Sequence, residues 1–134
     1  MSDASKAIVQ GLYDRINAAD FDVVEEVLSE DFIEHEEVPG LAPTRAGVRQ
    51  MFEMFHASFK GATFEVDDVI ADGDKVSVRG RLTGIHRAEF MGVPASGNAI
   101  NVGLSDYFRV ADGMVREHWG VMDTGALMQQ LTGG

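Results

Sequence analysis

Three carboxylates fall on one face of the last predicted hairpin, where they could do acid–base chemistry. Asp112-Gly113 separates two segments of alternating polarity, which is typical of a two-residue hairpin turn. Pairing the strands from this turn groups Asp106, Glu117 and Asp123 on the more apolar face. Trp119 and several aliphatic side chains share that face. A carboxylic acid in such surroundings has a raised pKa, which suits a general acid or base that works near neutral pH.

Each of these residues also has a structural explanation. Asp106 and Glu117 could pair with an arginine or a backbone amide, and Asp123 stands where it could cap a final helix. His86 continues the apolar face of the preceding hairpin, which turns at Asp72-Gly73. A histidine on such a face is commonly a hydrogen-bonded core residue. The residue pattern leaves both interpretations open for every one of them.

Several other chemistries find no support in the sequence. The chain has no cysteine, which excludes disulfides, thiolate metal sites and thiol catalysis. It has no phosphate-binding glycine loop, no dinucleotide fingerprint and no nucleophile elbow. No two of the four histidines have the local spacing of a zinc site. We therefore predict neither a metal ion nor a cofactor.

The elements that must position these residues divide the chain into a helical and a stranded half. Apolar residues recur at helical spacing over about 5–19, 21–28 and 44–59. Alternation predicts strands at about 63–71, 74–86, 99–110 and 114–123, and a short helix or tail follows. This order favours a single α+β domain over residues 1–134.

The third predicted helix carries the strongest apolar stripe, which includes Met51, Phe52 and Phe55. Thr44 is a plausible N-cap for it. A stripe of this kind is typical of a helix that packs on a sheet.

Charge and composition restrict the partners. The net charge of −11 and the pI near 4.6 argue against nucleic acid and anionic membranes, because the summed field repels phosphate. No stretch approaches the ~20 apolar residues of a membrane span. The first residues lack the basic region and apolar run of a secretory signal. We expect a cytoplasmic protein with no membrane partner.

Four segments carry a family resemblance: residues 31–35, 84–97, 106–109 and 112–123. The last is the most specific, because it ends in Glu-His-Trp-x-x-x-Asp. Together they resemble the SnoaL-like polyketide cyclases, ester cyclases that close a ring by intramolecular aldol condensation. The resemblance implies the cone-like fold of nuclear-transport-factor-like proteins, in which helices pack on a strongly curved antiparallel sheet that encloses an apolar pocket.

The resemblance also implies roles for individual residues. Asp123 matches the aspartate that acts as acid and base in the cyclases, and His86 and His35 match two family histidines. We expect these histidines, with Asp106 nearby, to polarise or orient carbonyl and hydroxyl oxygens. The expected residues around the substrate are Met51, Phe52, Phe55, Trp119 and Glu117.

The implied substrate is a small hydrophobic or aromatic molecule that contains a carbonyl group. A homodimer is expected through the outer face of the sheet, around Tyr107, Arg109, Arg116 and His118. Two other interpretations remain open: a non-catalytic module that binds a small molecule, and a different enzyme on this fold, such as an isomerase, dehydratase or epoxide hydrolase. The last needs an Asp-Arg-Asp arrangement in the pocket, and the outward position expected for Arg109 counts against it.

Overall fold

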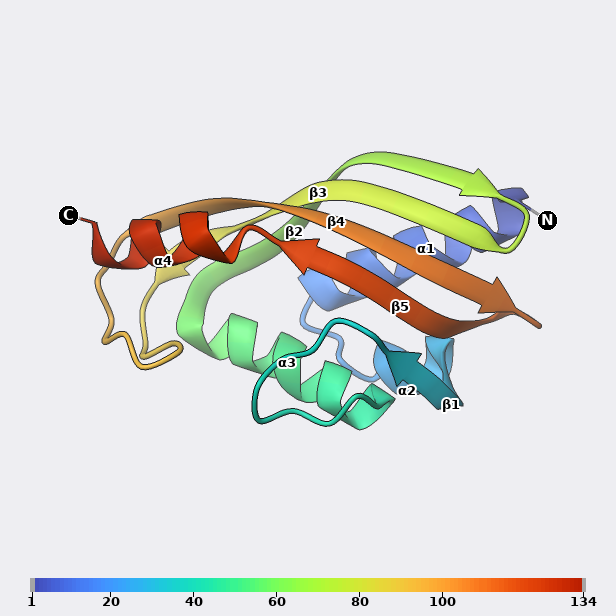
Figure 1. Cartoon of the computed structure of the whole chain (residues 1–134), viewed down its shortest axis with the longest axis horizontal. Coiled ribbons are helices and arrows are strands. Elements are labelled where there is room, and N and C mark those ends of the chain that lie inside the picture. Colours follow the sequence, from blue (N-terminus) through green and yellow to red (C-terminus); the bar gives the residue numbers. More distant parts are fainter. Residues whose placement is uncertain (1, 134) are drawn as a thin grey trace.

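Five strands form one curved, open sheet in the computed structural model, which describes residues 2–133. Their order is β1-β5-β4-β3-β2. The antiparallel part consists of β2 (Phe59–Asp72), β3 (Lys75–His86), β4 (Ala99–Ala111) and β5 (Met114–Met122). The remaining strand, β1 (Leu28–Glu34), pairs with β5 in parallel, so the sheet is mixed. The α+β fold with a curved sheet is confirmed, and Figure 1 shows the long strands arching over the helices.

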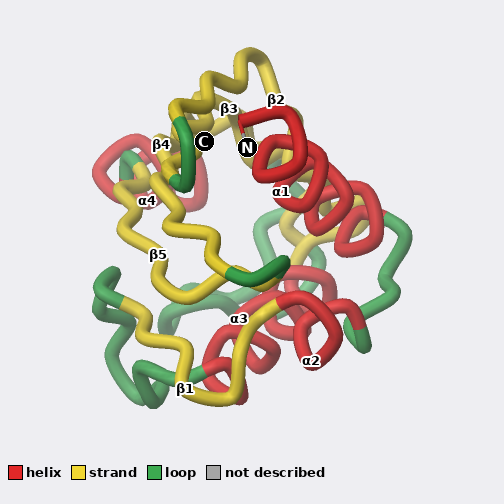
Figure 2. Tube along the Cα trace, turned by 90° about the vertical axis from the view of Figure 1, so that its right-hand side faces the viewer, coloured by secondary structure: helices red, strands yellow, loops and turns green. Residues whose placement is uncertain are grey.

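The helices lie mainly on the concave side of the sheet. They are α1 (Ser2–Asn17), α2 (Val23–Val27), α3 (Arg45–Ser58) and α4 (Thr124–Thr132). Helix α1 packs on β2 and β3, while α3 packs on β1 and β2. In Figure 2, α1 lies to the right of β4 and β5, and α3 lies below them. None of the helices within residues 2–133 is long and apolar enough to cross a membrane.

Apolar periodicity explains why α1 and α3 pack where they do. Val9, Leu12 and Ile16 are buried along one face of α1, and Phe52 and Phe55 are buried along α3. Burial of each such side chain contributes ~1.5–3 kcal/mol. The N-terminus of α3 is fixed as expected, because the Thr44 side chain accepts a hydrogen bond from the Gly47 amide at 3.4 Å.

A bulge in β5 changes the register that the sequence predicts. Val110 pairs with Val115 as expected from the turn, but Arg109 pairs with Glu117, so Arg116 is an extra residue in β5. Beyond this bulge every side chain of β5 points to the opposite face from the one we expected. His118 therefore points to the concave side, where it is 7% exposed.

Candidate active site

A cavity of about 500 Å³ lies between the concave face of the sheet and the helices. Most of its lining is apolar, and Met51, Phe52 and Phe55 of α3 line it together with Phe64 and Phe108 of the sheet. The expected position of the three α3 residues at the cavity wall agrees with the structure, and their contact with a substrate stays a prediction.

A cluster of polar side chains interrupts this apolar wall. His118 is its centre: the ring nitrogen Nε2 lies 2.7 Å from Asp106 Oδ1, and Nδ1 lies 2.5 Å from Glu34 Oε2. The Tyr13 hydroxyl donates a hydrogen bond to the other oxygen of Asp106. Glu36 lies beside them, and all five residues line the cavity. We call these residues, Tyr13, Glu34, Glu36, Asp106 and His118, the polar cluster.

Strand pairing brings three members of the polar cluster together. Glu34 at the end of β1 is the parallel neighbour of His118, and Phe108 is the antiparallel neighbour of His118 on its other side. Asp106 is two residues before Phe108 and therefore shares its face. The parallel strand and the bulge are both needed, because the bulge turns His118 toward Asp106 and the parallel strand places Glu34 beside His118.

Electrostatics keep His118 charged in this cluster. Burial lowers the pKa of His118, but the hydrogen bonds and charges of Asp106 and Glu34 outweigh burial and raise that pKa to about 10. Carboxylates only accept hydrogen bonds when ionised, so both ring nitrogens donate. Burial and the neighbouring Asp106 charge raise the pKa of Tyr13 well above its ordinary value, so its hydroxyl keeps its proton. The cluster thus holds an imidazolium between two carboxylates.

Glu36 differs from the other acids of the cluster. Burial raises its pKa, and the nearby negative charge of Asp106 raises it further. Its backbone amide donates to Glu34 at 3.1 Å, but no described residue donates a hydrogen bond to its carboxylate. A carboxylate with a raised pKa and no donor is well suited to accept a proton from a molecule in the cavity.

Three ligand atoms of the cluster could also hold a metal ion. One atom each of Glu34, Glu36 and His118 lies within 4.8 Å of the others. A metal ion needs a neutral imidazole, however, and the raised pKa of His118 favours the protonated ring. The arrangement favours proton transfer over metal binding at neutral pH.

The placement expected for Asp123 is wrong. β5 ends at Met122, and Asp123 is the N-cap of α4, where its Oδ1 accepts a hydrogen bond from the Ala126 amide at 3.0 Å. It is exposed and does not line the cavity. The first turn of α4 leaves amide groups without partners inside the helix, and an aspartate satisfies one of them.

His86 lies in the core and not in the cavity wall. It is 0% exposed, its Nδ1 accepts from the Ser96 amide at 3.2 Å, and its ring packs near that of Phe59. This pairing ties the end of β3 to the segment that leads into β4. His86 is therefore a hydrogen-bonded core residue, which was the structural explanation considered for it above, and it does not line the cavity.

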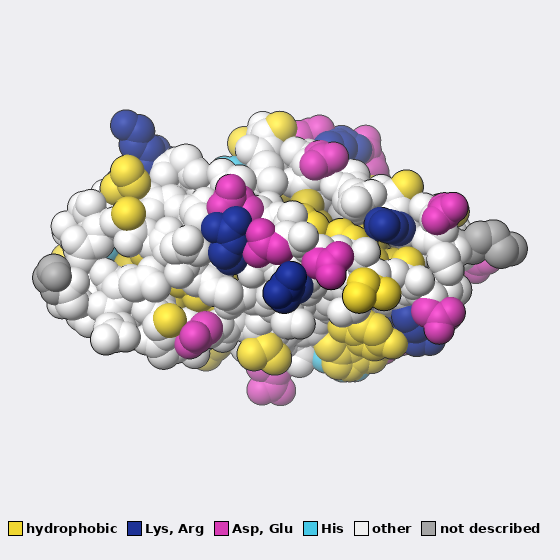
Figure 3. Space-filling model, turned by 90° about the horizontal axis from the view of Figure 1, so that it is seen from above, with side chains coloured by type: hydrophobic (Ala, Val, Ile, Leu, Met, Phe, Trp, Pro, Cys, Tyr) yellow, Lys and Arg dark blue, Asp and Glu magenta, His cyan; other side chains and the backbone are white. Residues whose placement is uncertain are grey.

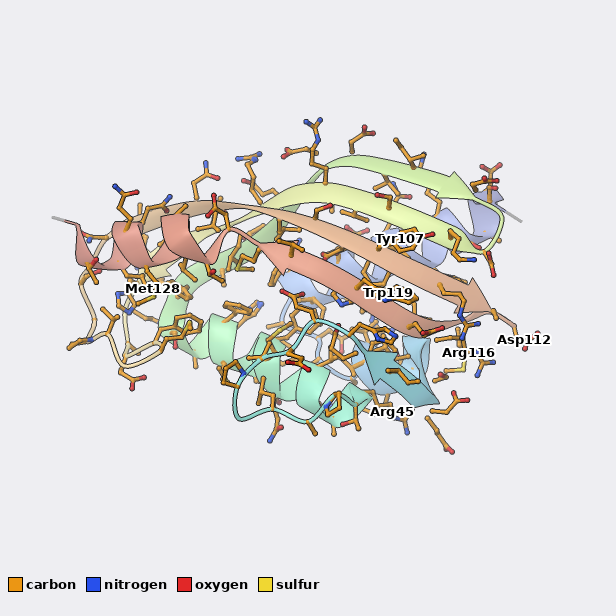
Figure 4. All side chains as sticks on the ribbon, viewed as in Figure 1. Arg45, Tyr107, Asp112, Arg116, Trp119 and Met128 are labelled. Atoms are coloured by element: carbon orange, nitrogen blue, oxygen red, sulfur yellow. The ribbon has the colours of Figure 1, made fainter. Side chains whose placement is uncertain are left out.

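Two expected substrate contacts and one expected catalytic histidine lie on the convex face. Because of the bulge, Glu117 and Trp119 point outward beside Tyr107 and Arg109, and Figure 4 shows Tyr107 and Trp119 on neighbouring strands. His35 stacks on Trp119, with ring centroids 4.5 Å apart, and its Nε2 lies 2.8 Å from Glu117. Hydrogen bonds from His35 and Arg109 lower the pKa of Glu117. Asp106 is the one expected acid–base residue that lines the cavity.

Sequence reasoning missed four members of the polar cluster. Tyr13 is adjacent to Leu12 on the buried face of α1. A hydroxyl group at this position in the apolar stripe could have indicated a polar residue in the cavity wall. Glu34 and Glu36 alternate with His35 at the end of β1, and that alternation would have placed them opposite it. His118 had no such signal, because its position depends on the bulge.

The family model for SnoaL-like polyketide cyclases matches residues 7–131. IdmH from Streptomyces antibioticus, a candidate polyketide cyclase, is 30% identical with a TM-score of 0.83, and the match covers 95% of this chain and 97% of that chain. TsrD from Streptomyces laurentii is 27% identical with a TM-score of 0.83, covering 95% and 96% of the two chains. AclR from Streptomyces galilaeus, a candidate hydroxylase, is 27% identical with a TM-score of 0.87, covering 98% and 97%. A comparison with curated proteins found no match.

The fold, the position of the cavity and the match over residues 7–131 agree with one another. The chain belongs to the SnoaL-like polyketide cyclase family.

Proposed function

We propose that this protein is an acid–base enzyme that removes a proton α to a carbonyl and promotes aldol-type ring closure of a hydrophobic, polyketide-like molecule. One observation carries the proposal: the Glu36 carboxylate, with a raised pKa and no donor among residues 2–133, lies beside a protonated His118 in the wall of an otherwise apolar cavity. This pairs a base with a fixed positive charge.

The reaction begins at Glu36. Its carboxylate takes the α-proton, and the electron pair of the broken C–H bond moves into the carbonyl, which becomes an enolate. The positive charge of His118 stabilises the negative charge that develops on the enolate oxygen, and its own position is held by Asp106 and Glu34. The enolate carbon then attacks a second carbonyl of the same molecule and forms the new C–C bond. The resulting alkoxide takes the proton back from Glu36, so no atom is gained or lost.

The apolar wall of the cavity accounts for the part of the rate enhancement that the general base does not supply. One general base contributes ~10²–10⁴-fold, so the cavity must also hold a flexible chain in the folded conformation that brings its two reacting carbons together. Phe52, Phe55 and Phe108 offer flat apolar surface for that purpose. Removal of water around Glu36 and His118 strengthens their electrostatic effect.

The test is exchange of the α-protons of β-tetralone, a neutral aromatic ketone, in deuterium oxide followed by proton NMR. Saturation-transfer NMR first establishes that the ketone binds. We expect the protein to accelerate exchange, and we expect Glu36→Gln to remove the acceleration while binding persists. The matched control is Glu37→Gln, which makes the same change at the next residue, an exposed one at the cavity edge, and should exchange like the unmodified protein.

Binding without accelerated exchange in the unmodified protein would contradict the proposal and favour a non-catalytic binding module. Equal exchange by the unmodified protein and Glu36→Gln would also contradict it, because Glu36 would then not be the base.

A further inference from the structure

Gly120 occupies a position in β5 where a side chain would enter the polar cluster. It pairs with Asp106 across the β4–β5 ladder and points to the same face as His118. A Cβ atom at this position would lie 2.4 Å from Glu36 Oε1, 2.7 Å from Asp106 Oδ1 and 2.7 Å from His118 Cε1. All three distances are well below van der Waals contact.

The backbone does not explain this glycine. Six glycines of the described chain have a positive φ, which favours glycine, but Gly120 is not among them. Another residue could therefore adopt the same backbone conformation. The requirement at position 120 is for space, and that space is occupied by the ends of three side chains.

These three side chains are not held equally. Asp106 is fixed by Tyr13 and His118, and His118 is fixed by Asp106 and Glu34. Glu36 is on the segment between β1 and α3, and no described residue donates to its carboxylate. A Cβ at position 120 would therefore displace Glu36 first.

We infer that Gly120 is a positioning residue: its missing side chain leaves the space in which the Glu36 carboxylate lies beside His118 and Asp106. The consequence for catalysis rests on the function proposed above, whereas the placement of the carboxylate does not. The loop residue Glu36 thereby becomes part of a cluster whose other members are on strands and on α1.

The displaced carboxylate should titrate differently. In the native protein Glu36 faces Glu34 of β1, Asp106 of β4, His118 of β5 and Tyr13 of α1, and burial is the main reason that its pKa is raised. Movement toward water relieves that burial. Gly120→Ala should therefore lower the pKa of Glu36 toward its ordinary value.

The experiment is a carbon-13 NMR titration of the Glu36 carboxyl group, assigned with Glu36→Gln, in the unmodified protein, Gly120→Ala and Gly103→Ala. Gly103 is the matched control, because it is in β4 and a Cβ there would meet nothing within 4 Å. We expect a lower Glu36 pKa in Gly120→Ala alone. An unchanged titration in Gly120→Ala would overturn the inference.

Exchange of β-tetralone protons gives the second readout. Gly120→Ala should lose as much activity as Glu36→Gln, and the double variant should lose no more than either, because both remove the same carboxylate from the site. Additive losses would contradict a positioning role. If the unmodified protein shows no exchange at all, the proposed function fails, and the NMR titration still decides the role of Gly120.

If Gly120→Ala is too unstable for NMR, its resistance to urea unfolding tests the inference instead. Adding Glu36→Ala removes the tightest contact of the new Cβ, so Glu36→Ala/Gly120→Ala should be more stable to urea than Gly120→Ala. If it is not, the obstruction does not involve Glu36 and the inference is wrong.

Discussion

The Nε2 atom of His118 lies 2.7 Å from Oδ1 of Asp106 in the cavity wall, and this pair joins the two central strands of the candidate site. With Glu34 on the other ring nitrogen, the imidazole has an acidic partner on each side. This arrangement fixes both the orientation and the charge of the ring.

Protonation of His118 should make the stability of the protein depend on pH. Its pKa rises from about 6.5 to about 10 on folding, so its contribution is fully present below about 6.5 and is lost as the pH rises through about 10. The expected loss is on the order of a few kcal/mol. Urea unfolding across this range measures it, with His118→Gln as the reference in which this slope disappears. A slope that persists in His118→Gln would show that other groups cause it.

The hydrogen bond between Tyr13 and Asp106 should contribute measurably to stability. Tyr13→Phe removes the donor and leaves a buried carboxylate oxygen without its partner, at a cost of ~1.5–3 kcal/mol in the free energy of unfolding. Tyr107→Phe is the control, because Tyr107 is 40% exposed on the convex face. Equal effects of the two substitutions on urea unfolding would mean that the bond to Asp106 adds nothing.

Asp123 should act as a helix cap and not as a proton carrier. Asp123→Ala should lower the free energy of unfolding by about 1 kcal/mol, whereas Asp123→Asn keeps a capping oxygen and should change it little. Both variants should exchange β-tetralone protons at the rate of the unmodified protein. Loss of exchange in Asp123→Asn with stability intact would restore the catalytic role that the family resemblance implied.

We also propose that the convex face of β5, β4 and β1 contacts a second copy of the chain. Ile33 and Tyr107 are 49% and 40% exposed there, and Figure 3 shows hydrophobic side chains exposed on the molecule seen from above. Ile33→Glu should then shift a dimer to monomers in sedimentation experiments. Ile70→Glu makes the same kind of change at a 64% exposed position in β2 and should leave association unchanged. A monomeric unmodified protein, or equal effects of both variants, would contradict this interface.

The elements were predictable because each depends on local chemistry. The Asp112-Gly113 turn formed as expected, with φ values of 54° and 75° that an aspartate and a glycine tolerate. The apolar stripe of α3 and its Thr44 cap are equally local. Asp106 and Arg109 are on β4, whose faces the bulge in β5 does not change, so the expected faces of both are confirmed.

The candidate site was less predictable because it depends on one extra residue. Arg116 forms the bulge, and its guanidinium bonds to the Ala111 carbonyl at 3.2 Å, near the turn end of β5 in Figure 4. Alternating polarity favoured the register without this insertion, because that register places Trp119 and Val121 on the concave face, whereas the bulge places His118, Gly120 and Met122 there. The parallel pairing of β1 with β5 also could not be predicted from local sequence patterns, because it joins segments far apart in the sequence.

The most direct test of the central claim is the pH dependence of β-tetralone exchange in the unmodified protein and in Glu36→Gln. A base at Glu36 beside a protonated His118 predicts a bell-shaped profile. Exchange should rise through a Glu36 pKa that lies above the ordinary glutamate value, and it should fall as His118 loses its proton at a pH of about 10. Glu36→Gln should show no rising limb. A rising limb of the same size and position in Glu36→Gln would contradict the account.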